Sequence, residues 1–231
     1  MKTADKPAPQ ACCCRRAHDH AAALLVTTVS QPVWHEPAVA RDQRWAHHRL
    51  HGATVWLTGL SGSGKSTIAD GVARDLLDAS VIAYVLDADN LRHGLNSNLG
   101  YSDTDRSENV RRVGEVARLF ADAGIVTIVP IISPFAADRA RVRVAHETAG
   151  LEFIEVHVAT SLAECERRDT KGLYKKVRAG EMRGVSGVDA PYEPPTSPDL
   201  VVGATGESVT ESVRRVVEQL RHSGVLGSRN S

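Results

Sequence analysis

The sequence predicts an α/β protein: a three-layer α/β/α sandwich in which helices cover both faces of a parallel sheet. Two observations support this fold class. Short runs of Val, Ile and Leu alternate with helical stretches from residue 54 onward, and such alternation is typical of parallel sheets. A glycine-rich loop, residues 59–66, joins the first apolar run to the first helical stretch. A chain of 231 residues fits one such domain with extensions.

The predicted strands are nearly continuous apolar runs, as expected for a sheet that is covered on both faces. They are Thr54–Thr58, Val81–Leu86, Ile125–Ile131, Leu151–Val158 and Asp199–Val202. The predicted helices lie between these strands or after the last one. The clearest is Ser107–Ala123, in which Val110, Val113, Ala117 and Phe120 fall on one face at helical spacing. The predicted helices are Lys65–Leu77, Ser107–Ala123, Ala136–Thr148, Ser161–Arg168 and Ser208–His222. Gly124 stands where a helix C-cap is expected.

Composition divides the chain into three segments. Residues 1–31 mix Pro, Ala, Cys and charge without periodicity, so we expect a poorly ordered tail. Residues 32–52 form a lead-in segment, in which Trp34 and Trp45 would be unfavourable to leave exposed. Residues 53–227 form the folded domain. Within it, Thr170–Pro198 holds four glycines and four prolines, and its length predicts a lid or binding loop.

Charge and cysteine usage argue against several partners. The formal net charge is zero, which disfavours a general nucleic-acid or membrane-surface binder. No stretch approaches the roughly 18 apolar residues of a membrane span. Three of the four cysteines, Cys12, Cys13 and Cys14, are adjacent, which is a poor disulfide arrangement and fits no common zinc pattern. We therefore expect a cytoplasmic protein with free thiols.

The segment Gly59–Ser66, with sequence GLSGSGKS, fits the phosphate-binding pattern G-x-x-x-x-G-K-[ST]. It follows a predicted strand and opens a predicted helix, which is the context that the pattern requires. Backbone N–H groups of such a loop point at phosphate oxygens, and the helix N-terminus adds partial positive charge. Lys65 is expected to reach the β- and γ-phosphates, and the Ser66 hydroxyl to bind Mg²⁺. The sequence thus predicts a P-loop that holds a nucleoside triphosphate.

Other polar residues follow the predicted strands at the edge where ligands bind in parallel sheets. Asp87 and Asp89 follow the second strand, where one carboxylate could support Mg²⁺ and one could accept a proton from an attacking hydroxyl. Ser133 follows the third strand. Two groups of cations suggest anion binding and a basic lid. The group expected to bind an anion is Arg92, Arg106, Arg111 and Arg112. The group expected in the basic lid is Arg167, Arg168, Lys171, Lys175, Lys176 and Arg178.

The chain lacks the guanine-reading N/T-K-x-D pattern and is small for a motor or transporter ATPase. A kinase for a small anionic metabolite is therefore favoured. Two alternatives stay open. One is a P-loop kinase for another small hydroxyl compound, such as a sugar acid or a nucleoside. The other is a non-catalytic ATP-binding subunit, or a domain cut from a sulfurylase–kinase fusion.

Six segments, in order, resemble the adenylylsulfate kinase (APS kinase) family of P-loop proteins. They are Thr58–Thr67, Leu86–Leu95, Leu99–Ser102, Arg106–Asn109, Ile132–Phe135 and Lys171–Lys176. The resemblance implies that the γ-phosphoryl group of ATP moves to the 3′-hydroxyl of adenosine 5′-phosphosulfate (APS), giving 3′-phosphoadenosine 5′-phosphosulfate (PAPS) and ADP in sulfate assimilation. It also implies a homodimer and suggests association with ATP sulfurylase.

The resemblance assigns the site residues as follows. ATP would contact Gly59, Leu60, Ser61, Gly62, Ser63, Gly64, Lys65, Ser66, Thr67 and Arg168, and Mg²⁺ would contact Ser66 and Asp87. APS would contact Asp89, Arg92, Tyr101, Arg106, Asn109, Ile132, Ser133, Lys171 and Val185. The catalytic residues would be Lys65, Asp87, Asp89 and Ser133. Ser133 matches a serine described in the family as a phosphoserine intermediate, although direct in-line attack needs only positioning, Mg²⁺ and a base such as Asp89.

Two positions depart from the family pattern. Ala88 replaces the glycine of D-G-D-N, which adds a methyl group in a tight turn. Val185 replaces the second of two aromatic residues that sandwich the substrate adenine, of which Tyr101 is the first. Loss of stacking there would remove about 0.5–1.5 kcal/mol. We therefore expect weaker APS binding, or weaker substrate inhibition, than is usual in the family.

Overall fold

A computed structural model describes residues 32–33, 35–204 and 206–226 of the chain. The chain groups into two compact units, Met1–Pro37 and Ala38–Ser231. The predicted tail, with Cys12, Cys13 and Cys14, and the predicted Trp34 contact lie outside the described residues. All the described helices and strands lie in the second unit.

Five parallel strands form the sheet of this unit. They are β1 (Ala53–Thr58), β2 (Ala83–Val85), β3 (Val126–Pro130), β4 (Glu152–Val158) and β5 (Leu200–Val202). Their order across the sheet is β2-β3-β1-β4-β5. The first strand is therefore central: Ala53 pairs with Val126 on one side and with Glu152 on the other. All five predicted strands are confirmed, although β2 is shorter than expected.

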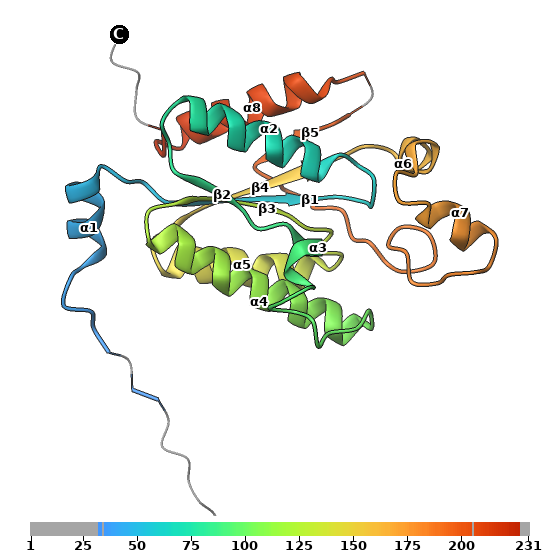
Figure 1. Ribbon diagram of the computed structural model, residues 1–231, viewed down its shortest axis with the longest axis horizontal. Coiled ribbons are helices and arrows are strands. Elements are labelled where there is room, and N and C mark those ends of the chain that lie inside the picture. The colour runs from blue at the N-terminus through green and yellow to red at the C-terminus, as the bar shows by residue number, and fades with distance from the viewer. Residues whose placement is uncertain (1–31, 34, 205, 227–231) are drawn as a thin grey trace, which may run out of the picture. The chain divides into compact units, whose positions relative to one another are not determined.

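Helices cover both faces of this sheet, as Figure 1 shows. On one face lie α2 (Lys65–Asp78) and α8 (Val209–His222), and on the other lie α4 (Asp103–Asp122) and α5 (Ala136–Thr148). Shorter helices complete the unit: α1 (Arg41–His48), α3 (Ala88–Leu91), α6 (Leu162–Arg168) and α7 (Leu173–Arg178). The three-layer α/β/α sandwich is confirmed.

Side-chain alternation along β1 divides the core into two clusters. Val55 and Leu57 face α2 and α8, whereas Trp56 between them faces α4 and α5. All three are fully buried. Burial of an aliphatic side chain contributes about 1.5–3 kcal/mol, so both helical layers are held to the strand that leads into the P-loop.

Three helix predictions were incomplete. The helix α4 begins at Asp103 rather than Ser107, because the Ser102 hydroxyl accepts a hydrogen bond from the Asp105 N–H and caps it there. The short helix α3 was not predicted. The stretch Thr170–Pro198 was expected to be a loop, but it contains α7, whose first turn is held by Asp169. The Asp169 carboxylate accepts hydrogen bonds from two backbone N–H groups of that turn.

The lead-in segment contributes α1, which packs against the C-terminal end of α4. Arg44 donates to a carboxylate oxygen of Asp122, and the Trp45 indole N–H donates to the Asp122 carbonyl at 3.0 Å. Arg41 donates to the Ala149 carbonyl at 2.6 Å. These contacts place α1 at the end of the sheet where the strands begin (Figure 1).

Candidate nucleotide and acceptor site

A cavity of about 920 Å³ lies where the strands end. The P-loop, the turn after β2, the start of α4, the loop after β3 and the lid segment line it. Most residues predicted from the sequence come together here. They are Ser61, Gly62, Gly64, Lys65, Ser66, Thr67, Asp87, Asp89, Arg92, Tyr101, Arg106, Asn109, Ile132, Ser133, Arg168, Lys171 and Val185. Gly59, Leu60 and Ser63 belong to the P-loop but do not line this cavity.

The P-loop needs glycine at both of its ends. Gly59 has φ +155°, and a Cβ there would lie 2.6 Å from the Val158 carbonyl oxygen. Gly64 has φ +104° and immediately precedes α2. The last residue of α6 adds a cation here, because a Cβ at Gly64 would lie 3.8 Å from Nη1 of Arg168. The loop therefore lies, with a neighbouring cation, at the positive end of a helix.

Lys65 is the buried cation of this loop. Its ammonium group donates to the carbonyl oxygens of Gly59 at 2.9 Å and Leu60 at 2.7 Å. Burial lowers the pKa of Lys65 from 10.5 to about 8, and the nearby Lys171 acts in the same direction. A triphosphate would offer this ammonium a stronger counter-charge than carbonyl oxygens do.

Two oxygen ligands suited to Mg²⁺ lie beside the P-loop. The Ser66 hydroxyl donates to Oδ2 of Asp87 at 3.1 Å. Oδ1 of Asp87 accepts hydrogen bonds from the N–H groups of Asp89 and Asn90, which caps α3 and fixes the carboxylate. A hydroxyl and a carboxylate oxygen fit a Mg²⁺ ion whose other ligands are phosphate oxygens and water.

The methyl group of Ala88 causes no strain in this turn. The residue begins α3 and has no positive φ. Its side chain packs against the core cluster between the sheet and α4. The turn therefore accommodates the methyl group without left-handed backbone.

Asp89 lies in the first turn of α3, and Arg92 caps its C-terminal end. Lys171 of the lid donates to a carboxylate oxygen of Asp89. Arg92 donates to the carbonyl oxygens of Leu99 and Gly100, and its guanidinium lies 4.4 Å from the centre of the Tyr101 ring. This cation–π contact and the loop carbonyls hold Arg92 beside the predicted adenine-stacking residue.

Arg106 and Asn109 lie on the first turns of α4, and both are buried. Arg106 uses all three guanidinium nitrogens. It donates to the Tyr101 carbonyl, to the Ser186 hydroxyl at 2.9 Å and to the Gly184 carbonyl at 2.5 Å. It therefore ties the lid segment to α4 besides lining the cavity. Asn109 accepts a hydrogen bond from Asn96 at 3.0 Å.

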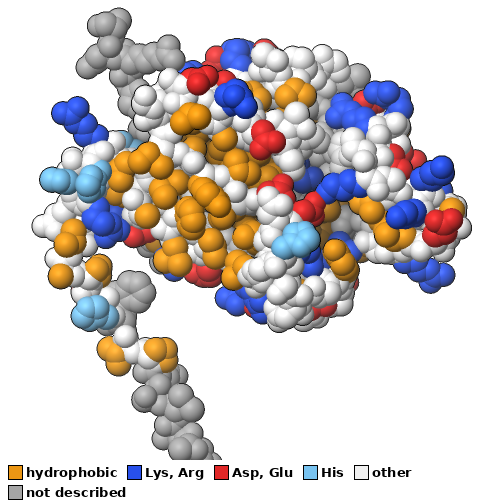
Figure 2. Space-filling view, viewed as in Figure 1, with side chains coloured by type: hydrophobic (Ala, Val, Ile, Leu, Met, Phe, Trp, Pro, Cys, Tyr) orange, Lys and Arg blue, Asp and Glu red, His pale blue; other side chains and the backbone are white. Residues whose placement is uncertain are grey.

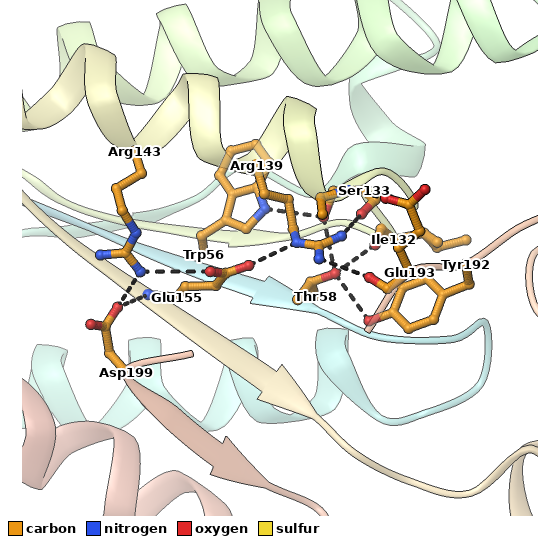
Figure 3. A network of polar contacts seen from close by, with 11 residues as sticks. Trp56, Thr58, Ile132, Ser133, Arg139, Arg143, Glu155, Tyr192, Glu193 and Asp199 are labelled. Carbon is orange, nitrogen blue, oxygen red and sulfur yellow. Dashed lines mark hydrogen bonds and ion pairs between the residues drawn. The ribbon is translucent and has the colours of Figure 1, made fainter. Parts of the chain in front are cut away.

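Ser133 is held by a chain of hydrogen bonds that sequence reasoning missed (Figure 3). The Trp56 indole N–H donates to the Ser133 hydroxyl at 3.1 Å, which donates to the Thr58 hydroxyl at 3.0 Å. Thr58 in turn donates to the Ile132 carbonyl at 2.7 Å. The Ser133 side chain is 1% exposed. Its only proton is thus already directed at Thr58, away from the cavity.

The lid is anchored to the P-loop through α7. The Tyr174 hydroxyl donates to the Ser61 carbonyl at 2.8 Å, and burial raises its pKa. Tyr174 packs with Cys165 and Val185 in a third apolar cluster that also includes Leu60 of the P-loop. Val185 is 7% exposed, so most of its side chain serves this cluster while part of it lines the cavity.

The functional residues missed from the sequence share one property: they hold other site residues in place through contacts that are distant in the chain. Tyr174 lies within one of the matched segments, yet only the fold shows that it reaches Ser61. Thr160 donates to the Ser63 carbonyl at 2.8 Å across 97 positions of sequence. The polar residue Thr58, which directly precedes Gly59, was the one available signal.

The geometry of a P-loop, two carboxylates and a basic lid around one cavity agrees with the comparison to known families. A model of the adenylylsulphate kinase family matches residues 51–203. The chain belongs to the adenylylsulphate kinase family. It is 52% identical over 198 residues to an adenylyl-sulfate kinase of Citrobacter koseri, covering 85% of this chain and 96% of the relative. It is 49% identical over 195 residues to a probable adenylyl-sulfate kinase of Halalkalibacterium halodurans, covering 84% and 96%.

Solved structures of APS kinases share this fold. The APS kinase of Mycobacterium tuberculosis, solved in complex with AMPPNP and APS, is 52% identical. It superposes with a TM-score of 0.72 over 74% of this chain and 99% of that one. The hexameric APS kinase of Thiobacillus denitrificans is 31% identical, with a TM-score of 0.58 over 77% of this chain and 30% of the other.

Proposed function

We propose that this chain transfers the γ-phosphoryl group of ATP to the 3′-hydroxyl of APS, giving PAPS and ADP, within sulfate assimilation. The family is that of adenylylsulphate kinases, which are ATP-dependent phosphotransferases. The observation that carries the proposal is that the Ser66–Asp87 pair and Asp89 lie at one cavity with the P-loop. Donor phosphates, Mg²⁺ and an acceptor hydroxyl can therefore meet there.

The donor would be bound by the P-loop. Backbone N–H groups of Ser61–Thr67 would hold the phosphates, and Lys65 and Arg168 would place positive charge on them. Ser66 and Asp87 would hold Mg²⁺, which would neutralise phosphate charge when bound. Phosphoryl transfer depends mostly on positioning and charge stabilisation, and these residues supply both.

The acceptor would lie on the opposite side of the cavity. We assign its phosphosulfate to Arg92, Arg106 and Asn109, and its adenine to the space between Tyr101 and Val185. Ile132, Ser133 and Lys171 would complete the contacts. The 3′-hydroxyl oxygen would attack the γ-phosphorus, the bond to the β-γ bridging oxygen would break, and Asp89 would take the hydroxyl proton.

Direct transfer is favoured over a covalent phosphoserine at Ser133. The hydroxyl of that residue is enclosed, accepts from Trp56 and donates to Thr58. A phosphoryl acceptor would have to leave both partners and turn into the cavity. We therefore assign Ser133 a role in binding APS, as part of the loop after β3 that lines the cavity, and no covalent role.

The test is ADP release by the purified protein with Mg·ATP and one acceptor at a time: APS, gluconate or a nucleoside. Turnover with APS alone supports the proposal, and turnover with gluconate or a nucleoside favours a kinase for another hydroxyl compound. Calorimetric binding of AMPPNP without ADP release from ATP under any condition favours a non-catalytic ATP-binding subunit. Lys65→Ala separates turnover at this site from a contaminating kinase.

We further propose that residues 53–227 carry this activity, that the protein is a homodimer, and that it works in the cytoplasm. Among the residues that the structure describes, no helix is long and apolar enough to cross a membrane. The free thiol of Cys165 suits a reducing compartment. The formal net charge is zero, which argues against nucleic acid as a partner. Transfer of APS from an associated ATP sulfurylase remains a prediction.

A further inference from the structure

The loop after β3 has a backbone conformation that its neighbours must maintain. Ser133 has φ +41°, in the left-handed region, which costs a residue with a side chain about 1–2 kcal/mol. This residue and Ile132 line the acceptor side of the cavity. Something outside the cavity must therefore hold the loop in its place.

Arg139 supplies that support from the first turns of α5. Its Nη1 donates to the Ser133 carbonyl at 2.7 Å, and its Nη2 donates to the Glu193 carbonyl at 2.7 Å. Its Nε donates to Oε1 of Glu155 on β4 at 2.7 Å. The side chain is 3% exposed and does not line the cavity. All three nitrogens thus serve to join three separate segments (Figure 3).

The second segment that Arg139 holds is the end of the lid. Glu193 donates its N–H to the Pro134 carbonyl at 2.8 Å, and its carboxylate accepts from the Ala136 N–H at 2.7 Å. The neighbouring Tyr192 hydroxyl lies 3.3 Å from that of Thr58. Because the Thr58 proton already points to Ile132, Tyr192 is the donor in this pair. Residues 192–193 are therefore fixed to the loop after β3, whereas residues 182–186 of the lid line the cavity.

A buried carboxylate network keeps the Arg139 guanidinium in place. The Glu155 side chain is 11% exposed and lies between Arg139 and Arg143, with Oε2 3.6 Å from Arg143. Arg143 also donates to Asp199 at 2.6 Å. The charges are thus paired, and the planar guanidinium of Arg139 matches two carbonyls and one carboxylate at once.

We propose that Arg139 is a positioning residue for the acceptor, one that fixes the Ile132–Ser133 loop and the end of the lid as a single unit. This rests on the proposed function, because the loop matters only if the acceptor binds against it. Arg139 touches neither nucleotide nor acceptor and acts through the Ser133 and Glu193 carbonyls. Its loss should change how the acceptor is held and leave donor binding at the P-loop unaffected.

The principal test is Arg139→Lys, which keeps the charge beside Glu155 but cannot make the three directed contacts together. We expect the KM for APS to rise at least about tenfold, or kcat per AMPPNP-binding site to fall by a similar factor, while the affinity for AMPPNP by calorimetry stays within about twofold. A merely structural role would lower the active fraction without changing the KM for APS. An unchanged KM and kcat would overturn the proposal.

Two further variants keep the test decisive. Arg139→Met with Glu155→Met removes both charges, which avoids leaving one of them buried without a partner, and should reproduce the defect in acceptor KM or kcat. The control is Arg141→Lys, the same change at an arginine of α5 whose side chain is 68% exposed and pairs with Asp138, so its KM for APS should stay near that of the unmodified protein. A double variant with normal kinetics would overturn the proposal. Failure of the unmodified protein to use APS would instead refute the proposed function.

Discussion

The Lys171 ammonium and the Asp89 carboxylate form an ion pair between residues 82 positions apart in the chain. Asp89 lies on the short helix after β2, and Lys171 lies in the lid two positions before α7. Both side chains are more than half exposed, so the pair contributes little to folding stability. Its importance is positional, because it brings a lid cation to the proposed base.

Asp89→Asn should lower kcat strongly without preventing donor binding. The amide cannot accept the proton of the acceptor hydroxyl, and general bases typically contribute about 10²–10⁴-fold. The measurement is ADP release with APS, paired with calorimetry using AMPPNP. Lys171→Ala is the matched control, since it removes the other half of the pair and leaves the base. An Asp89→Asn variant with normal kcat would remove the residue from its catalytic role.

Donor affinity should fall as the pH rises through the pKa of Lys65. Burial lowers that pKa to about 8, so the ammonium of the ligand-free protein loses its proton above pH 8. A bound triphosphate favours the charged form, and nucleotide binding at pH 8–9 should therefore take up a proton. Calorimetry of AMPPNP binding in buffers of different ionisation enthalpy measures this uptake. The uptake should disappear in Lys65→Met; a persistent uptake would assign it to another group.

Ser133→Ala should stay active. Removing the hydroxyl deletes the contacts with Trp56 and Thr58 and should destabilise the fold by about 1–3 kcal/mol. The Ser133 carbonyl and its Arg139 contact remain, so kcat should stay within about tenfold of the unmodified protein if transfer is direct. Thermal unfolding and ADP release measure the two effects. Folded Ser133→Ala that binds AMPPNP but shows no turnover would support a phosphoserine intermediate instead.

Val185→Phe should lower the KM for APS. A ring at this position would face the cavity opposite Tyr101, and stacking of about 0.5–1.5 kcal/mol corresponds to about a twofold to tenfold change. The side chain also packs against Tyr174 and Cys165, so thermal unfolding should accompany the kinetics to detect overpacking. Val185→Leu is the control that adds volume without a ring. An unchanged KM in a stable Val185→Phe variant would contradict the stacking argument.

An exposed apolar surface beside strand β2 should form the contact between subunits. Leu77, Ile82, Tyr84 and Leu119 are each 54–72% exposed. Figure 2 shows hydrophobic side chains gathered on this face of the molecule. Such a concentration favours contact with a second copy. Sedimentation should show a dimer that Tyr84→Glu shifts toward monomer, while Val144→Glu, at a similarly exposed position on α5, should leave the dimer intact. A monomeric unmodified protein would contradict the proposed homodimer.

The sequence predicted what depends on local pattern. The apolar runs identified all five strands, and the spacing of Gly59, Gly64 and Lys65 identified the P-loop. It did not predict α7, because glycines flank that helix and its cap comes from Asp169 upstream. Nor could it show that Trp56 and Thr58 hold the Ser133 hydroxyl, or that Tyr192 reaches Thr58, since those contacts join residues 75 to 134 positions apart. Long-range polar contacts have no signature in sequence spacing.

The attachment of α1 to Asp122 and Ala149 has a practical consequence for handling this enzyme. These contacts bring the polypeptide into the catalytic unit at the amino ends of the strands, whereas substrates are handled at the carboxyl ends. An affinity tag or a fused partner joined directly to α1, in a chain that begins at Ala38, would therefore lie on the side remote from phosphoryl transfer. Immobilisation through that end should leave substrate access open.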